Sequence, residues 1–150
     1  MKEYIATLEK EFSLIKNGFK EEEKKAFLDY KSNDNEHSKA LAFLAYESDV
    51  YQVRMYGVFL FGYLSEDENI LEFMRDKVSH DDNWRVQEVL AKAFDEFCKK
   101  TGYKQALPII DEWLKSSNLI LSILVDTFCS RISLSMPPIP KSHNTACVLS

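Results

Sequence analysis

Trp84 and Glu88 form the sharpest chemical feature of the chain. They are four residues apart, so on a helix their side chains project from the same face, about one turn from each other. An indole face and a carboxylate both attract positive charge, the first through cation–π contact and the second through Coulomb attraction. The pair is therefore a candidate site for a cationic group.

Each of these residues also has a structural interpretation. A tryptophan at the start of a helix often packs on the preceding loop, and a glutamate on a helix is usually a surface or ion-paired acid. Arg54 and Arg85 lie within a turn of the aromatic residues Tyr51 and Trp84, and they can pair with acids instead of binding a ligand. The residue pattern leaves both interpretations open.

The segment 81–101 is predicted to form the helix that carries the pair. Asp82 and Asn83 can accept hydrogen bonds from the free N–H groups of the first turn, and Lys99 and Lys100 lie in the last turn, where the helix dipole favours cations. Gly102 follows as a C-terminal cap. Apolar residues spaced by three and four predict one buried stripe: Val86, Val89, Leu90, Ala93, Phe94 and Phe97.

Helical spacing of apolar residues predicts further helices at 4–15, 19–30, 36–47, 50–64, 69–78, 103–114 and 119–134. Pro108 falls inside one of them, so that helix either begins near Leu107 or is kinked. The charged run EEEKK, residues 21–25, is expected to be a solvated face. The chain has only four glycines and four prolines, whereas strand-rich folds need many tight turns. An all-α fold is therefore predicted.

The predicted helices repeat at a period in the thirties. A shift of 33 residues aligns Tyr51 with Trp84 and Phe61 with Phe94. A shift of 35 residues aligns Asn118 with Asn83. Helix pairs at such a period are typical of an α-solenoid, in which each unit buries its apolar stripe against its neighbours.

One helical-repeat domain is expected at 1–135 and an extended or disordered tail at 136–150. A length of 150 residues suits a single domain, and three of the four prolines lie in the terminal segment MPPIPKSHNTACVLS. The net charge of −5 argues against a protein that coats nucleic acid by charge alone, but a local basic face is compatible with it.

The composition also bounds the setting of the protein. The N-terminus lacks the apolar core of a secretory signal, and no long uncharged apolar run predicts a transmembrane helix. Three cysteines, Cys98, Cys129 and Cys147, lack metal-type spacing and suit reduced thiols in a cytoplasm. The sequence gives no reason to expect a metal ion or a cofactor, and no membrane partner is expected.

The stretch DNWRVQEVLAKAFDEFCKKTGYKQALPIIDEWL resembles the bacterial DNA alkylation repair proteins, a HEAT-repeat family that includes alkylpurine DNA glycosylases. The preceding ESDVYQVRMYGVFLFGYLS resembles the repeat before it, and together they span residues 47–118. The resemblance implies a HEAT-like α-solenoid of antiparallel helix pairs whose concave face receives duplex DNA. In the glycosylases that face holds an aromatic residue and, four positions later, a carboxylate; these positions are Trp84 and Glu88 here, with Glu in place of the usual Asp.

The implied reaction is excision of a cationic alkylated purine by hydrolysis of its N-glycosidic bond. A carboxylate can stabilise the developing positive charge on the sugar or orient a water molecule, and an indole can hold the cationic base. On this basis Trp84 and Glu88 are the candidate catalytic residues. The candidate contacts to DNA, through phosphates or stacking, are Tyr51, Arg54, Arg85, Lys99, Lys100 and Lys104.

The chain departs from the family pattern after about Ser117. The family carries arginines early in the next repeat, whereas the segment NLILSILVDTFCSR is apolar until Arg131. A shifted reading frame or a truncation would account for this loss of charge, and an exposed apolar C-terminal helix is expected to drive self-association. Two alternatives to a glycosylase follow: a non-catalytic repeat module that binds protein or nucleic acid, or an inactive truncated relative.

Overall fold

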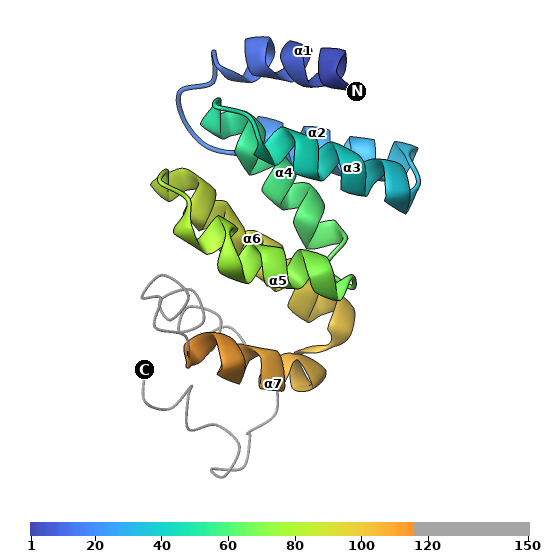
Figure 1. Cartoon of the computed structure of the whole chain (residues 1–150), viewed down its shortest axis with the longest axis vertical. Helices are drawn as coiled ribbons and strands as arrows, with labels where there is room; N and C mark the ends of the chain where they lie inside the picture. Colours follow the sequence, from blue (N-terminus) through green and yellow to red (C-terminus); the bar gives the residue numbers. More distant parts are fainter. Residues whose placement is uncertain (116–150) are drawn as a thin grey trace. The chain divides into compact units, whose positions relative to one another are not determined.

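Helices make up all the regular structure in residues 1–115, the part of the chain that the computed structural model describes. They are α1 (Lys2–Phe12), α2 (Lys20–Ser32), α3 (Asn35–Tyr46), α4 (Tyr51–Tyr63), α5 (Glu68–Asp76), α6 (Trp84–Thr101) and α7 (Tyr103–Leu114), with a 3-10 turn η1 (Val78–His80) before α6 (Figure 1). The predicted all-α fold is confirmed for these residues. The predicted helix at 119–134 and the tail at 136–150 lie outside them.

The predicted helix bounds hold to within about three residues. The largest N-terminal difference is at α6, which begins at Trp84 because residues 81–83 form its capping loop instead of its first turn. The alternative start near Leu107 is wrong, since α7 runs from Tyr103 and includes Pro108. Proline lacks a backbone N–H, so this helix forgoes one internal hydrogen bond at that point.

Residues Met1–Phe97 form one compact unit, and the rest of the chain, Cys98–Ser150, belongs to a second. In the first unit α4 packs against α1, α2, α3 and α5. Ten of the 13 residues of α4 are buried, so this helix is apolar on nearly all sides. In the second unit the predicted apolar residues Ala106, Ile110 and Trp113 are buried.

The 33-residue period of the sequence is a period of the structure. α1, α3 and α5 begin at Lys2, Asn35 and Glu68, and α4 and α6 begin at Tyr51 and Trp84; each step is 33 residues. Equivalent core positions are buried in all three odd-numbered helices: Leu8, Leu41 and Met74, then Phe12, Ala45 and Val78. The helices therefore stack as repeated pairs, as the sequence predicted.

Even the hydrogen bonds of the helix starts repeat. Before α4 the Ser48 hydroxyl accepts the Val50 N–H at 3.1 Å, and before α6 the Asp81 carboxylate accepts the Asn83 N–H at 2.9 Å. The fourth residue of each helix then donates back to the loop: Arg54 to the carbonyl of Ser48 and Gln87 to the carbonyl of Asp81. The register that aligns Tyr51 with Trp84 is thus confirmed by contacts as well as by helix bounds.

The EEEKK run is not a solvated face throughout, and the prediction is wrong for Glu22. This residue is fully buried on α2, and both of its carboxylate oxygens lack a hydrogen-bond partner. Burial raises the pKa of the Glu22 carboxyl; its own backbone N–H and the charge of Arg85 oppose that rise with smaller effects. Helical spacing alone put this position one turn before Ala26, on the buried side of α2.

Replacing Glu22 with methionine, of similar length and without polar atoms, is expected to stabilise the protein at pH 7 by about 1–3 kcal/mol. Because the folded-state pKa is raised, the unfolded chain releases this proton first as pH rises from about 4.5, so wild-type stability falls over that window. Glu22→Met removes this loss, and the gain over wild type should disappear in acid. Urea unfolding between pH 4 and pH 8 measures it.

The control for this prediction is Glu21→Met, at the exposed neighbouring position. Its effect should stay within about 0.5 kcal/mol at every pH. If wild type instead gains stability relative to Glu22→Met as pH rises, Glu22 is a favourably placed carboxylate and its burial without a partner is wrong.

Candidate functional site

Trp84 and Glu88 lie together at one pocket in the first unit. The cavity is about 240 Å³ and is lined by residues from α6, from α4 and from the turn before α2: Gly18, Phe19, Met55, Trp84, Arg85, Glu88 and Val89. The four-residue spacing on α6 therefore does what was predicted of it, since it places the ring and the acid on a common surface. Arg85, a candidate DNA contact, belongs to the same pocket.

The indole of Trp84 is presented to solvent. It is 64% exposed, which argues against the interpretation of this residue as a structural staple on the preceding loop. The guanidinium carbon of Arg85 lies 5.0 Å from the centre of the Trp84 ring. A cation thus already lies within cation–π distance of this indole, the kind of contact proposed for a charged ligand.

Glu88 is exposed at the same pocket. It takes part in none of the ion pairs that the structure shows between residues 1 and 115. The carboxylate is therefore open to solvent and to a ligand, which does not support its interpretation as an ion-paired surface acid.

The wall opposite α6 comes from the turn before α2. Gly18 has a φ of +77°, a backbone conformation that favours glycine, and the chain then enters the pocket at Phe19. The Phe19 ring lies 6.1 Å from that of Phe59 and 4.3 Å from the Lys92 ammonium. Sequence reasoning missed Gly18, Phe19, Met55 and Lys92 as parts of this site, because no periodic signal relates residues 18–19 to α6.

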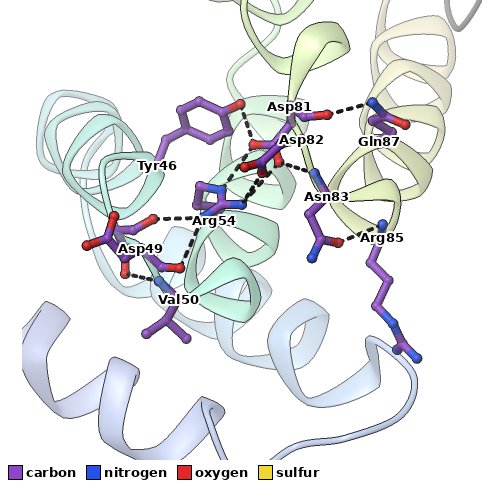
Figure 2. A network of polar contacts seen from close by, with 10 residues as sticks. Tyr46, Asp49, Val50, Arg54, Asp81, Asp82, Asn83, Arg85 and Gln87 are labelled. Carbon is purple, nitrogen blue, oxygen red and sulfur yellow. Dashed lines mark hydrogen bonds and ion pairs between the residues drawn. The ribbon is translucent and has the colours of Figure 1, made fainter.

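The start of α6 is fixed by a network of polar contacts (Figure 2). Asn83 caps the helix, since its side-chain oxygen accepts the Arg85 N–H at 2.9 Å. Asp82 does not cap it: its carboxylate accepts from Arg54 at 3.2 Å. Of the two predicted capping residues, Asn83 is confirmed.

Arg54 belongs to this network and not to the pocket. Its guanidinium donates to both oxygens of Asp81, at 3.0 and 3.1 Å, and to the backbone carbonyls of Ser48 and Asp49. The side chain is only 14% exposed. For Arg54 the structure therefore favours pairing with acids, the alternative that the sequence left open, over contact with DNA.

Asp81 is the acceptor at the centre of the network. Burial would raise the pKa of its carboxyl, but hydrogen bonds from Arg54, from the Asn83 N–H and from the Tyr46 hydroxyl together lower it. Burial, with the bond to Asp81, raises the pKa of Tyr46, so its phenol stays a donor, at 2.7 Å. The ion pair is thus maintained across the physiological pH range.

The remaining candidates lie elsewhere on the surface. Tyr51 begins α4 and is half-buried. Lys99 and Lys100 occupy the last turn of α6, and Lys104 lies on α7; all three are exposed and belong to the second unit. The pocket in the first unit does not include any of these four residues.

Between residues 1 and 115 no group of three or more His, Cys, Asp or Glu side chains is arranged to hold a metal ion. Cys98 is buried, as its apolar surroundings predicted. Among the helices described, none has the length and apolar character needed to cross a membrane.

Two solved structures resemble this chain closely. AlkD2 from Streptococcus mutans is 58% identical, with a TM-score of 0.83, over 97% of this chain and 79% of that one. The protein smu.31 from Streptococcus mutans UA159 is 65% identical, with a TM-score of 0.84, over 97% of this chain and 69% of that one. Neither the models of protein families nor the curated proteins gave a match. Since identity and fold agree over nearly its whole length, the chain belongs to the AlkD-like family of HEAT-like DNA alkylation repair proteins.

Proposed function

We propose that this protein binds duplex DNA at the pocket of Trp84 and Glu88, and that the pair acts there on a purine made cationic by alkylation. The observation that carries the proposal is the exposure of an indole and a carboxylate at one pocket on α6. Both groups favour a positive charge. Membership of a DNA alkylation repair family supports DNA as the carrier of that charge.

The proposed reaction is hydrolysis of the N-glycosidic bond. Alkylation at a ring nitrogen makes the base a cation, so the bond to the sugar is weakened and its electron pair leaves with the base. Water supplies the oxygen that replaces the base on the sugar, and one proton is released. Glu88 stabilises the positive charge that develops on the sugar, and Trp84 holds the charged base against its ring.

Backbone phosphates are the other part of the proposal. Arg85 lies at the pocket and is the nearest candidate, while Tyr51, Lys99, Lys100 and Lys104 are proposed as outer contacts. Arg54 is left out because its donors are taken by Asp81, Asp82 and two carbonyls. A cationic base that stacks on the face of Trp84 now next to Arg85 would displace that guanidinium, which is then available to a phosphate.

A second candidate function is binding of DNA without cleavage. It is favoured by the exposure of both Trp84 and Glu88, because a carboxylate in water stabilises a developing charge far less than one in a water-excluded site. Incubating the protein with methylated duplex DNA and measuring released purine separates the two candidates. Release by the wild type supports excision, whereas binding with no release supports the second function.

Binding to duplex DNA is expected to weaken as salt rises, because phosphate contacts release counterions. Arg85→Gln should reduce the slope of log affinity against log salt by about 1, the contribution of one phosphate contact. Fluorescence anisotropy of a labelled duplex at several salt concentrations measures the slope. Arg75→Gln, which changes the same charge on α5 where Arg75 pairs with Asp76, should leave it unchanged. An affinity that is independent of salt contradicts the DNA assignment.

A further inference from the structure

A buried ion pair joins α4 to the loop that starts α6, directly before Trp84. Arg54 donates two hydrogen bonds to the carboxylate of Asp81, and Tyr46 donates a third at 2.7 Å. The Arg54 and Asp81 side chains are 14% and 5% exposed. Bidentate, partly desolvated pairs of this kind hold their geometry more firmly than surface ion pairs.

The same carboxylate reaches the first turn of α6 through a short chain of hydrogen bonds (Figure 2). Asp81 accepts the Asn83 N–H, and Asn83 in turn accepts the Arg85 N–H. The Asp81 carbonyl also accepts from the Gln87 amide at 2.6 Å. Trp84 lies between these anchored residues, so the contacts made by Asp81 fix the point from which the indole projects.

The preceding repeat shows that a helix start does not need this ion pair. Ser48 holds the position equivalent to Asp81, 33 residues earlier, and its neutral hydroxyl forms the equivalent turn with Val50. α4 begins at the equivalent residue, Tyr51, without a carboxylate there. The charged contact is thus an addition at the one helix start that carries Trp84 and Glu88.

We propose that Tyr46, Arg54 and Asp81 are positioning residues that set the placement of the Trp84–Glu88 pair. The consequence for DNA rests on the proposed function; the consequence for Trp84 itself does not. A displacement of about 1 Å can reduce a positioned reaction by about a hundredfold, so a firm anchor next to the site has a large effect. Tyr46, Arg54 and Asp81 touch no ligand in this scheme and act only through α6.

Tyr46→Phe tests the proposal with little risk to the fold, because it removes one hydroxyl and keeps the ring. Tyr56→Phe is the matched control: it removes a similar phenol-to-carboxylate bond, 2.6 Å to Asp29, from another part of the same unit. The first readout is acrylamide quenching of tryptophan fluorescence in the full chain. Trp84 is 64% exposed and Trp113 only 2%, so the quenchable emission reports Trp84. Tyr46→Phe should change it and Tyr56→Phe should not.

The second readout is the ratio of affinities for a duplex with one cationic methylpurine and for the same duplex without it. A purely structural loss lowers both affinities together, whereas a misplaced Trp84 lowers the ratio. We expect Tyr46→Phe to reduce the ratio about two- to tenfold, the worth of one hydrogen bond, and Asp81→Asn to reduce it further. If Tyr46→Phe matches Tyr56→Phe in quenching, the positioning role is overturned. If quenching changes but wild type shows no preference for the alkylated duplex, the positioning role stands and the proposed function falls.

Discussion

Glu88→Gln is expected to reduce release of alkylated purine from duplex DNA by about 100- to 1,000-fold, the usual effect of removing one preorganised electrostatic group from a reaction centre. Glutamine keeps the size of the side chain but not its charge, so it cannot stabilise the positive charge on the sugar. Glu88 is exposed, so the substitution should leave stability within about 0.5 kcal/mol of wild type. Chromatography of the released base under single-turnover conditions measures the rate.

Glu72→Gln is the matched control for this prediction. Glu72 is an exposed acid on α5 outside the pocket, and its neutralisation changes the net charge by the same amount. The rate of release should be unchanged in this variant. If Glu88→Gln releases purine as fast as wild type does, the carboxylate has no part in the reaction and the site assignment is wrong.

The second large effect is expected at Gly62, where α4 and α6 come closest. A Cβ atom placed on Gly62 would lie 2.8 Å from the Ala93 Cα and 3.1 Å from its Cβ. The nearest obstacle is backbone, so one helix must move. Gly62→Ala gains about 1 kcal/mol of helix propensity, but overpacking costs about 1–3 kcal/mol or more. We expect a net loss for Gly62→Ala, and about 3 kcal/mol for Gly62→Val, which lacks the propensity gain.

Chemical unfolding of wild type, Gly62→Ala and Gly62→Val measures this prediction. Gly57→Ala provides a graded comparison in the same helix, because its added Cβ would meet its nearest atom at 3.0 Å instead of 2.8 Å. It should cost less than Gly62→Ala. A Gly62→Ala protein as stable as wild type would show that α4 and α6 are not in contact at this point.

The fold was predictable because local signals and the repeat agree. Apolar spacing located the helices, and the alignment of Tyr51 with Trp84 predicted a register that the helix starts now confirm. Polar capping was predictable in kind, since Asn83 does cap α6. Its detail was not, because Asp82 is drawn away by an arginine 28 residues earlier, and a partner that distant leaves no mark on local spacing.

Burial of charged residues was the least predictable part of the site. Glu22 and its exposed neighbours Glu21 and Lys24 look alike in the sequence, and only the packing of α2 against α4 decides which side is inside. Arg54 and Arg85 likewise each follow an aromatic residue closely. One is nearly buried in a network of acids, whereas the other lies over Trp84 at the pocket. Tertiary contacts and not residue type separate the two roles.

The most direct test of the central claim is a fluorescence titration of the full chain with two short duplexes that differ by one cationic alkylated purine. The exposed indole of Trp84 is the reporter. Our account predicts that the alkylated duplex quenches this emission at a concentration about five- to thirtyfold lower, the worth of a cation–π contact of about 1–2 kcal/mol. Identical quenching curves for the two duplexes would contradict it, because the pocket of Trp84 and Glu88 would then not distinguish a charged purine from an ordinary one.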